Sequence, residues 1–338
     1  MQTFALKHEA MSITIKQIAE HVGVSPATVS RVLSGRGAHL ISEATRQRVW
    51  QAAEELGYHP NLAARSLVTG RTGIVALWMS ELFTSFHARV VQLVEEHLHQ
   101  QGYDTLIRCV SRLSGTAWHG MGRVDGILAH EGAAHLQKVW KPLQRRGIPL
   151  VSMGAYALTD TDHVRIDLYE GATLAVRHLL ETGCRRIAYL VNAESRYVGE
   201  PRRDGYDRVM GAAGLPSEYI VATDQSRAES SLAVRRYVLE YGLPDGIFCH
   251  NDEMAIGAYH GLRLLGVHVP DDVAIVGCDG IEDTEYLDVP LTTIRQPLEE
   301  MCRLAVEFLQ KRIVEPHIER QSALLRPALV VRASTQRG

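Results

Sequence analysis

Two helix start signals, separated by one short turn, lie near the beginning of the 338-residue sequence. Thr14 and Gln17 have the spacing of a capping box, and apolar residues then recur at helical intervals, so a helix is expected there. Gly23 ends this helix, and Ser25 with Pro26 provides the N-cap and the first residue of the next one. Two short helices joined in this way form a helix-turn-helix, whose second helix can enter the major groove of DNA.

Two further helices are expected to complete this N-terminal region. The third begins at Ser42 and ends before Gly57, with its apolar residues on one face. Asn61 follows a proline and is expected to cap a short fourth helix, which Gly70 ends. A helical domain of this size buries only a modest core, so each of its apolar positions matters.

The charge of the chain is unevenly distributed. Residues 12–71 carry roughly +3, whereas the whole chain has a formal net charge of −3. A basic head on an acidic body fits DNA binding by the head, because lysine and arginine side chains displace counterions from phosphates. Charge alone would equally fit a solvated surface, so it supports the helix-turn-helix prediction only in combination with the helix signals.

From residue 73 onward, the pattern alternates between strands and helices. Apolar strands are expected at 73–79, 104–109, 126–129, 148–154, 164–166, 187–191, 219–222, 246–249 and 273–276. Amphipathic helices are expected between them, at 86–100, 172–180, 205–213, 230–241 and 252–265. This alternation predicts parallel sheets covered by helices on both faces. Two runs of similar length predict two doubly wound subdomains, with a ligand cleft at the carboxyl ends of the strands.

Cysteine usage and hydropathy argue against secreted and membrane proteins. The five cysteines are scattered and form no Cys-x-x-Cys pair, which favours reduced thiols over disulfides or a zinc site. No segment contains the eighteen or so consecutive apolar residues of a membrane helix. Residues 1–11 lack the apolar run of a secretory signal, so a cytoplasmic protein is expected.

Two other classes of protein are less consistent with the sequence. An enzyme is not expected, because the chain has no Gly-x-Ser-x-Gly elbow and no Walker-type phosphate loop. A transport-type binding protein would share the two-subdomain body. It would need an export signal, however, and would have no use for a basic helix-turn-helix head.

Three groups of motifs, in order along nearly the whole chain, match a known family. The first includes Thr28-Val29-Ser30-Arg31-Val32-Leu33 and Leu56-Gly57-Tyr58-x-Pro60-Asn61. The second includes Arg202-x-x-Gly205-Tyr206. The third includes Asn251-Asp252-x-Met254-Ala255-x-Gly257, Val276-Gly277-Cys278-Asp279 and Pro290-Leu291-Thr292-Thr293-Ile294-Arg295-Gln296-Pro297. In these motifs the chain resembles the LacI/GalR family of bacterial transcription regulators.

The resemblance implies a homodimer that reads a nearly palindromic operator, with one recognition helix for each half-site. Arg31 has the fork geometry that pairs with guanine O6 and N7, although a phosphate contact is the alternative. Pro26 and Ala27 occupy the positions that most distinguish operators among relatives. The residues expected to meet DNA are Thr14, Ser25, Pro26, Ala27, Thr28, Ser30, Arg31, Asn61, Ala64 and Leu67.

Residues 61–68 resemble the hinge helix of the family. Leu67 has the position of a minor-groove wedge that kinks DNA, although it would alternatively pack against the other subunit. So short a helix is marginal in isolation, so its order should depend on DNA and on the partner hinge. A ligand that shifts the two subdomains would therefore change operator affinity through the hinge.

The resemblance also implies a small-molecule effector in the cleft, and a sugar-like molecule is the first expectation. An arginine, an amide and a carboxylate that converge on a cleft can hydrogen-bond hydroxyls or an anionic group, which suits sugars and purines. Asn251 and Asp279 would alternatively cap helices. The residues expected to line the effector site are Phe86, Arg196, Arg202, Asn251, Asp279 and Gln296.

The expected architecture is an all-α helix-turn-helix head and an α/β body that resembles periplasmic binding proteins, without cofactor or metal. The head is predicted at 12–68 and the effector-binding and dimerisation body at 72–335. The body's N-subdomain is expected at 72–168 and 297–318, and its C-subdomain at 169–296 and 319–335. The departures from the family include Gln225 in place of a frequent aromatic residue, and a 112–124 segment that is too short for the second helix of the first subdomain at normal length.

Overall fold

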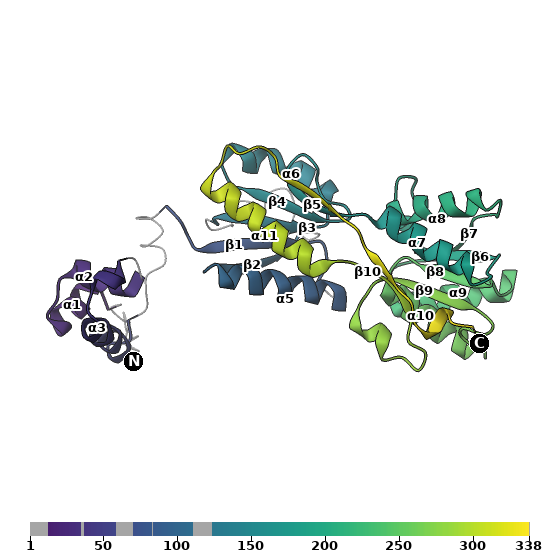
Figure 1. Ribbon diagram of the computed structural model, residues 1–338, viewed down its shortest axis with the longest axis horizontal. Coiled ribbons are helices and arrows are strands. Elements are labelled where there is room, and N and C mark those ends of the chain that lie inside the picture. The colour runs from purple at the N-terminus through teal and green to yellow at the C-terminus, as the bar shows by residue number, and fades with distance from the viewer. Residues whose placement is uncertain (1–12, 35–36, 59–69, 83, 111–123, 338) are drawn as a thin grey trace, which may run out of the picture. The chain divides into compact units, whose positions relative to one another are not determined.

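The computed structural model describes residues 13–34, 37–58, 70–82, 84–110 and 124–337 (Figure 1). The chain divides into two compact units, Met1–Thr72 and Gly73–Gly338, which we call the head and the body. The predicted hinge helix, with Asn61, Ala64 and Leu67, lies outside the described residues, as does most of the short 112–124 segment. Within the described residues, no helix is long and apolar enough to cross a membrane.

The described part of the head contains the first three predicted helices. They are α1 (Ile15–Val22), α2 (Pro26–Ser34) and α3 (Glu43–Glu55), with a 3-10 turn at Ala38–Leu40. The capping box is formed at Thr14, and Gly23 ends α1 with a left-handed φ of 73° that a residue with a side chain adopts only with strain. Ile18, Val29 and Val49 are fully buried where the helices meet, so the expected apolar faces form the core.

The first sheet of the body is entirely parallel. Its strands, in spatial order, are β11 (Ser322–Leu325), β5 (Asp162–Ile166), β4 (Leu150–Gly154), β3 (Gly126–His130), β1 (Ile74–Met79) and β2 (Asp104–Cys109). Alternate residues of β1 and β3 pack in two different core clusters, one shared with α5 (Ser85–Gln100) and the other with α6 (Ala133–Arg145). This alternation places helices on both faces of the sheet, as predicted.

The second sheet is parallel except at one edge. In spatial order it contains β12 (Ala328–Val330), β10 (Thr292–Arg295), β9 (Ala274–Asp279), β8 (Gly246–Cys249), β6 (Ile187–Asn192) and β7 (Glu218–Ala222), with β12 antiparallel to β10. Its helices are α7 (Leu168–Glu181), α8 (Pro201–Ala212), α9 (Arg227–Tyr241) and α10 (Asp252–Leu264). The body thus has the predicted architecture of two doubly wound sheets.

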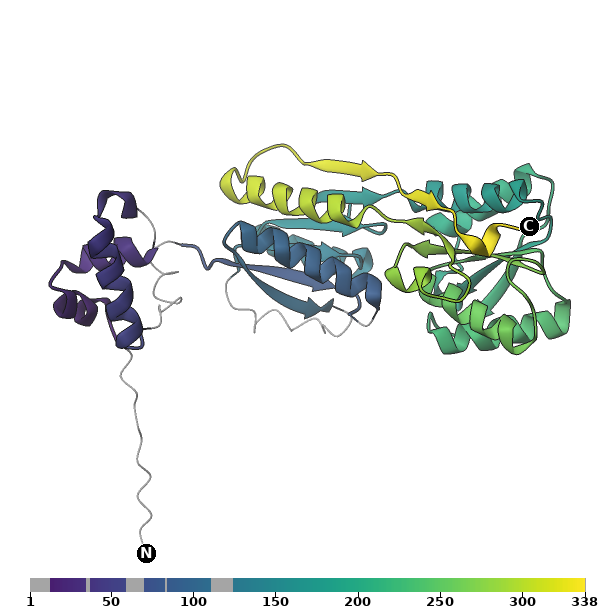
Figure 2. The ribbon, with the colours of Figure 1, turned by 60° about the horizontal axis from the view of Figure 1, so that its bottom comes forward.

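The chain crosses between the two sheets at Asp167, at Gln296-Pro297 and at Arg326-Pro327. The last crossing is visible as the yellow segment in Figures 1 and 2. One predicted boundary is wrong. Residues 319–335 were expected in the C-subdomain, but β11 pairs with β5 in the first sheet. Asp162 holds this segment: it accepts hydrogen bonds from the Arg312 guanidinium (2.7 and 2.8 Å) and from the backbone N–H of Gln321 (2.8 Å).

Some elements differ in extent from the predictions. Helix α7 begins at Leu168, earlier than expected, because the Asp167 side chain accepts a hydrogen bond from the Glu170 N–H and caps it. Strand β9 continues to Asp279 rather than ending at residue 276. Helices α6 and α11 (Leu298–Val314) were not predicted as separate elements, and α6 contains Pro142, which disfavours a helix interior.

Candidate DNA-binding head and effector cleft

The recognition helix α2 exposes the predicted DNA-reading face. Ser25 caps the helix, since its Oγ accepts a hydrogen bond from the Thr28 N–H at 3.1 Å. Val29 and Val32 are buried, and the side of the helix opposite to them faces solvent. The predicted contacts that are exposed are Thr14, Ser25, Pro26, Ala27, Ser30 and Arg31, and Thr28 is half-buried. Their role in DNA binding stays a prediction.

A tyrosine connects the two subdomains of the body. Tyr156 follows β4 of the first sheet, whereas Glu200 and Arg202 belong to the start of α8 beside the second sheet. The Tyr156 hydroxyl donates a hydrogen bond to Glu200 Oε1 (2.5 Å) and accepts one from Arg202 Nη1 (2.7 Å). These contacts join the two subdomains at the carboxyl ends of the strands, the place predicted for the effector cleft because ligands bind there in open α/β sheets.

Arg202 is the centre of a buried polar network. It is 6% exposed and also donates through Nη1 to Glu200 Oε1 (3.1 Å) and to His250 Nε2 (3.4 Å). Burial lowers the pKa of the guanidinium, but Tyr156, Cys278 and Glu200 outweigh burial and raise that pKa well above its ordinary value. The pKa of His250 lies well below its usual range because of burial and the Arg202 charge, so a neutral imidazole accepts the hydrogen bond.

Asp279 and Gln296, both predicted effector residues, lie in direct contact. Gln296 Nε2 donates to Asp279 Oδ1 at 2.8 Å, and the two residues are 9% and 5% exposed. Burial and the nearby charge of Asp252 raise the pKa of Asp279 well above its usual value, although Arg202 and Gln296 oppose this shift. Asp279 caps no helix, and Gln296 lies in a crossing segment, so any group bound here contacts a segment that joins the subdomains.

Asn251 has the capping role that was the alternative prediction. Its Oδ1 accepts a hydrogen bond from the Met254 N–H (2.8 Å) and caps α10. Its Nδ2 donates to Gln225 Oε1 (2.8 Å), so the glutamine that replaces an aromatic residue supports this asparagine. Asn251 remains 9% exposed at the end of β8, and contact with an effector stays a prediction.

The remaining two predicted effector residues lie in different surroundings. Phe86 is 8% exposed, with its ring centroid 5.5 Å from that of His87 and 5.8 Å from that of His130. Arg196 is exposed, and its guanidinium lies 5.8 Å from the centroid of the Tyr219 ring. No hydrogen bond or ion pair in the described part of the chain joins the Arg196 side chain to Arg202 or Asp279.

Sequence reasoning missed several residues of this cleft, among them Tyr156, Glu200, His250 and Glu131. Only Glu200 has a recognisable local signal, because an acidic residue directly before a proline is typical of a helix N-cap. Among the described residues, no group of three or more His, Cys, Asp or Glu side chains is arranged to hold a metal ion. The groups that Tyr156, Glu200, Arg202 and His250 bring together here are polar and hydrogen-bonded.

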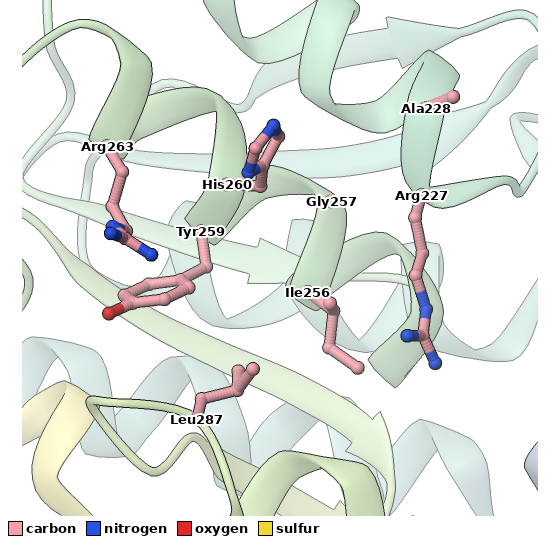
Figure 3. Close-up of a pocket in the computed structure, with 8 residues that line it drawn as sticks. All are labelled: Arg227, Ala228, Ile256, Gly257, Tyr259, His260, Arg263 and Leu287. Atoms are coloured by element: carbon pink, nitrogen blue, oxygen red, sulfur yellow. The ribbon is translucent and has the colours of Figure 1, made fainter.

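A hollow lies elsewhere on the C-subdomain. It measures about 280 Å³ and is lined by residues of α9 and α10 together with Leu287 (Figure 3). The close-up shows Tyr259 and Arg263 from α10 on one side and Arg227 from α9 on the other. None of the six predicted effector residues lines it, so this hollow is separate from the cleft that contains Arg202.

Replacing Tyr156 by phenylalanine should destabilise the body, because buried Glu200 then loses a donor and the subdomains lose their hydroxyl bridge. We expect a loss of about 1–3 kcal/mol in the free energy of unfolding, measured by urea titration. The matched control is Tyr286→Phe, since the Tyr286 side chain is 77% exposed. Equal stabilities of the two variants would show that the bridge contributes nothing.

Comparison with known proteins places both parts of the chain in one family. A model described as "Bacterial regulatory proteins, lacI family" matches residues 14–61, and one described as "Periplasmic binding protein-like domain" matches residues 176–335. The HTH-type transcriptional repressor PurR of Aliivibrio fischeri (strain MJ11) is 33% identical over 332 residues, covering 95% of this chain and 98% of that protein.

Solved structures of related proteins match the chain over both the head and the body. The Lac repressor dimer bound to operator and the anti-inducer ONPF has a TM-score of 0.83 at 25% identity, with 96% of this chain and 99% of that chain covered. The transcriptional regulator CelR in complex with cellobiose has a TM-score of 0.67 at 31% identity, with 95% and 99% covered. The helix-turn-helix head, the two-sheet body and the relatives that match nearly the whole chain all agree. The chain therefore belongs to the LacI family of bacterial regulatory proteins and is a DNA-binding transcriptional regulator.

Proposed function

We propose that the chain is a homodimeric cytoplasmic repressor whose operator binding is controlled by a neutral, hydroxyl-rich effector of the sugar class. The observation that carries the effector class is the charge around Arg202. This guanidinium forms an ion pair with Glu200 at 3.1 Å, and its charge also acts to lower the pKa of two further carboxyl groups, Glu131 and Asp279.

This arrangement favours hydroxyl groups over phosphates. The Arg202 charge is already matched by Glu200 at 3.1 Å, so a phosphate would meet carboxylates without a second cation to offset them. Hydroxyls donate to carboxylates and accept from guanidinium N–H groups, so a neutral sugar satisfies both. The CelR structure supports the proposal, because that protein, 31% identical to this chain, was solved with cellobiose.

The proposed readout uses a pseudo-palindromic operator. Two copies related by a two-fold axis present two recognition helices, so the operator should mirror that symmetry. The Lac repressor, which resembles this chain over both units, was solved as a dimer on operator DNA. Thr14, Ser25, Pro26, Ala27, Thr28, Ser30 and Arg31 are the described residues that we propose meet DNA, and Asn61, Ala64 and Leu67 of the hinge segment complete the set.

The proposed control passes through the segments that join the subdomains. An effector that hydrogen-bonds Arg202 and Asp279 competes with Tyr156 and Gln296, the present partners of those side chains. Its binding therefore changes contacts that span the subdomains or lie in a crossing segment. We assign effector contacts to Arg202, Asp279 and Gln296 first, and to Asn251, Phe86 and Arg196 second.

Two measurements on the purified full-length chain test this function. Fluorescence anisotropy with DNA from upstream of its own gene should show specific binding whose affinity falls steeply with salt. Thermal-shift assays with ribose, lactose, cellobiose, glucose 6-phosphate and hypoxanthine should give stabilisation by a neutral sugar, because a ligand that binds the folded state raises the Tm. Stabilisation by glucose 6-phosphate or hypoxanthine alone would refute the neutral-sugar proposal.

A further inference from the structure

Two acidic residues, one at a strand end of each sheet, have positive φ angles. Among the described non-glycine residues, Glu131 (φ 58°) and Asp279 (φ 147°) are those with positive φ. Each stands at the carboxyl end of a strand inside its sheet, Glu131 directly after β3 and Asp279 at the end of β9. Residues other than glycine rarely adopt positive φ, and such backbone strain concentrates at functional sites. Asp279 is already assigned to the effector, so Glu131 is its counterpart on the N-subdomain.

The surrounding chain is shaped to hold the Glu131 carboxylate. The backbone N–H of Ala155 donates to Oε1 (2.8 Å) and that of Tyr156 donates to Oε2 (2.9 Å). Gly154 leaves the space for this carboxylate, because a Cβ at that position would lie 2.3 Å from Oε1. The carboxylate is therefore fixed in one orientation by backbone groups of β4 and the loop after it.

This fixed carboxylate keeps hydrogen-bonding capacity. Each oxygen accepts one backbone N–H, which leaves a lone pair on each, and the residue is only partly buried. Burial raises the pKa of Glu131 to about 7, while the two backbone N–H groups and Arg202 of the other subdomain act to lower it. Tyr156 connects the two groups, because its backbone N–H donates to the Glu131 carboxylate (2.9 Å) and its hydroxyl accepts from Arg202 (2.7 Å).

Two buried side chains, one on the residue before Glu131 and one bound to Tyr156, lack partners for part of their hydrogen-bonding capacity. Arg202, 6% exposed, has no acceptor for its Nε among the described residues. His130, the fully buried neighbour of Glu131 in the chain, has no partner for either ring nitrogen within the same residues. Buried polar groups are normally paired, so unpaired groups beside a strained carboxylate point to a polar ligand.

We propose that Glu131 is a second effector-binding carboxylate, which accepts hydrogen bonds from effector hydroxyls on the N-subdomain while Asp279 does so on the C-subdomain. This inference rests on the proposed neutral-sugar effector. A ligand held by both carboxylates contacts both subdomains, so binding is coupled to their separation. The pair also selects ligands that carry hydrogen-bond donors on two sides.

The test is isothermal titration calorimetry of the full-length chain at pH 8, where the Glu131 carboxylate is ionised, with ribose, lactose and cellobiose. Glu131→Gln should weaken the binding of the sugar that binds wild type by roughly 10- to 150-fold, the worth of a hydrogen bond to a charged group. The matched control is Glu315→Gln, because Glu315 is an exposed residue outside the cleft. The control should bind as wild type does.

A thermodynamic cycle separates a contact from a loss of folding. Deoxy analogues of the binding sugar are titrated into wild type and into Glu131→Asp. The aspartate keeps the charge, but its side chain is one methylene group shorter, so its carboxylate lies farther from the ligand. The hydroxyl bound by Glu131 is the one whose removal weakens binding to wild type but not to the variant. Equal affinities of wild type and Glu131→Gln overturn the role of Glu131 alone. Absence of binding by all three sugars to wild type overturns the neutral-sugar effector, and the role of Glu131 with it.

Discussion

The Arg31→Ala variant should lose sequence-specific operator binding and keep its fold. Arg31 is exposed on α2, on the side opposite the buried residues Val29 and Val32, so its removal leaves the core of the head unchanged. A bidentate contact to guanine contributes roughly 1–3 kcal/mol of discrimination, and a dimer has two such contacts. The affinity for the operator should therefore fall between about 30-fold and 10⁴-fold, measured by fluorescence anisotropy at fixed salt.

A cation outside the recognition helix provides the control for this prediction. Lys16 is exposed on α1, and Lys16→Ala should weaken operator and unrelated DNA to a similar degree, with a smaller salt dependence. Circular dichroism should show the same helix content for both variants. If Arg31→Ala weakens operator and unrelated DNA equally, the arginine contacts phosphate and reads no base.

The Arg202→Met variant should lose both effector response and stability. Arg202 pairs with Glu200, which is fully buried, so the change leaves a carboxylate without a cation in a low-dielectric site. Removal of one partner from a buried ion pair costs about 3–5 kcal/mol. For a body of this size the Tm should fall by roughly 6–20 °C in calorimetry, and no sugar should raise it.

The stability effect can be separated from the loss of the ligand contact. In the double variant Glu200→Gln/Arg202→Met the buried charge is also removed, so part of the lost Tm should return. Effector response should remain absent, because the guanidinium that binds hydroxyls is still missing. A double variant that regains sugar binding would show that Arg202 only neutralises Glu200.

The head was predictable from sequence because its determinants are local. The capping box at Thr14, the glycine at the end of α1 and the serine cap of α2 act within four residues of each other along the chain. Apolar residues at helical spacing then mark the side that is buried, as Ile18 and Val29 confirm. The exposed side of α2 follows from the same periodicity, so the candidate DNA-reading face needed no tertiary information.

The body was predictable as a class of fold but less so in its boundaries. Alternating strands and helices require parallel sheets, since each strand must return over a helix. The sheet to which a strand belongs depends on contacts that are remote in sequence. Strand β11 joins the first sheet because Asp162 binds Arg312 and Gln321, residues about 150 positions away, and no local signal contains that pairing.

The sequence by itself determined the family and the two-part organisation, and it predicted an effector site with Arg202, Asp279 and Gln296. Only the tertiary structure decided that Tyr156 of the other subdomain contacts Arg202 and also binds Glu131, and that Asn251 caps α10. The physical reason is range. Helix caps and hydrophobic periodicity act over a few residues. The hydrogen bonds of the buried Arg202 guanidinium instead involve residues that are tens of positions away in the chain, and only the packing of the two sheets brings these residues together.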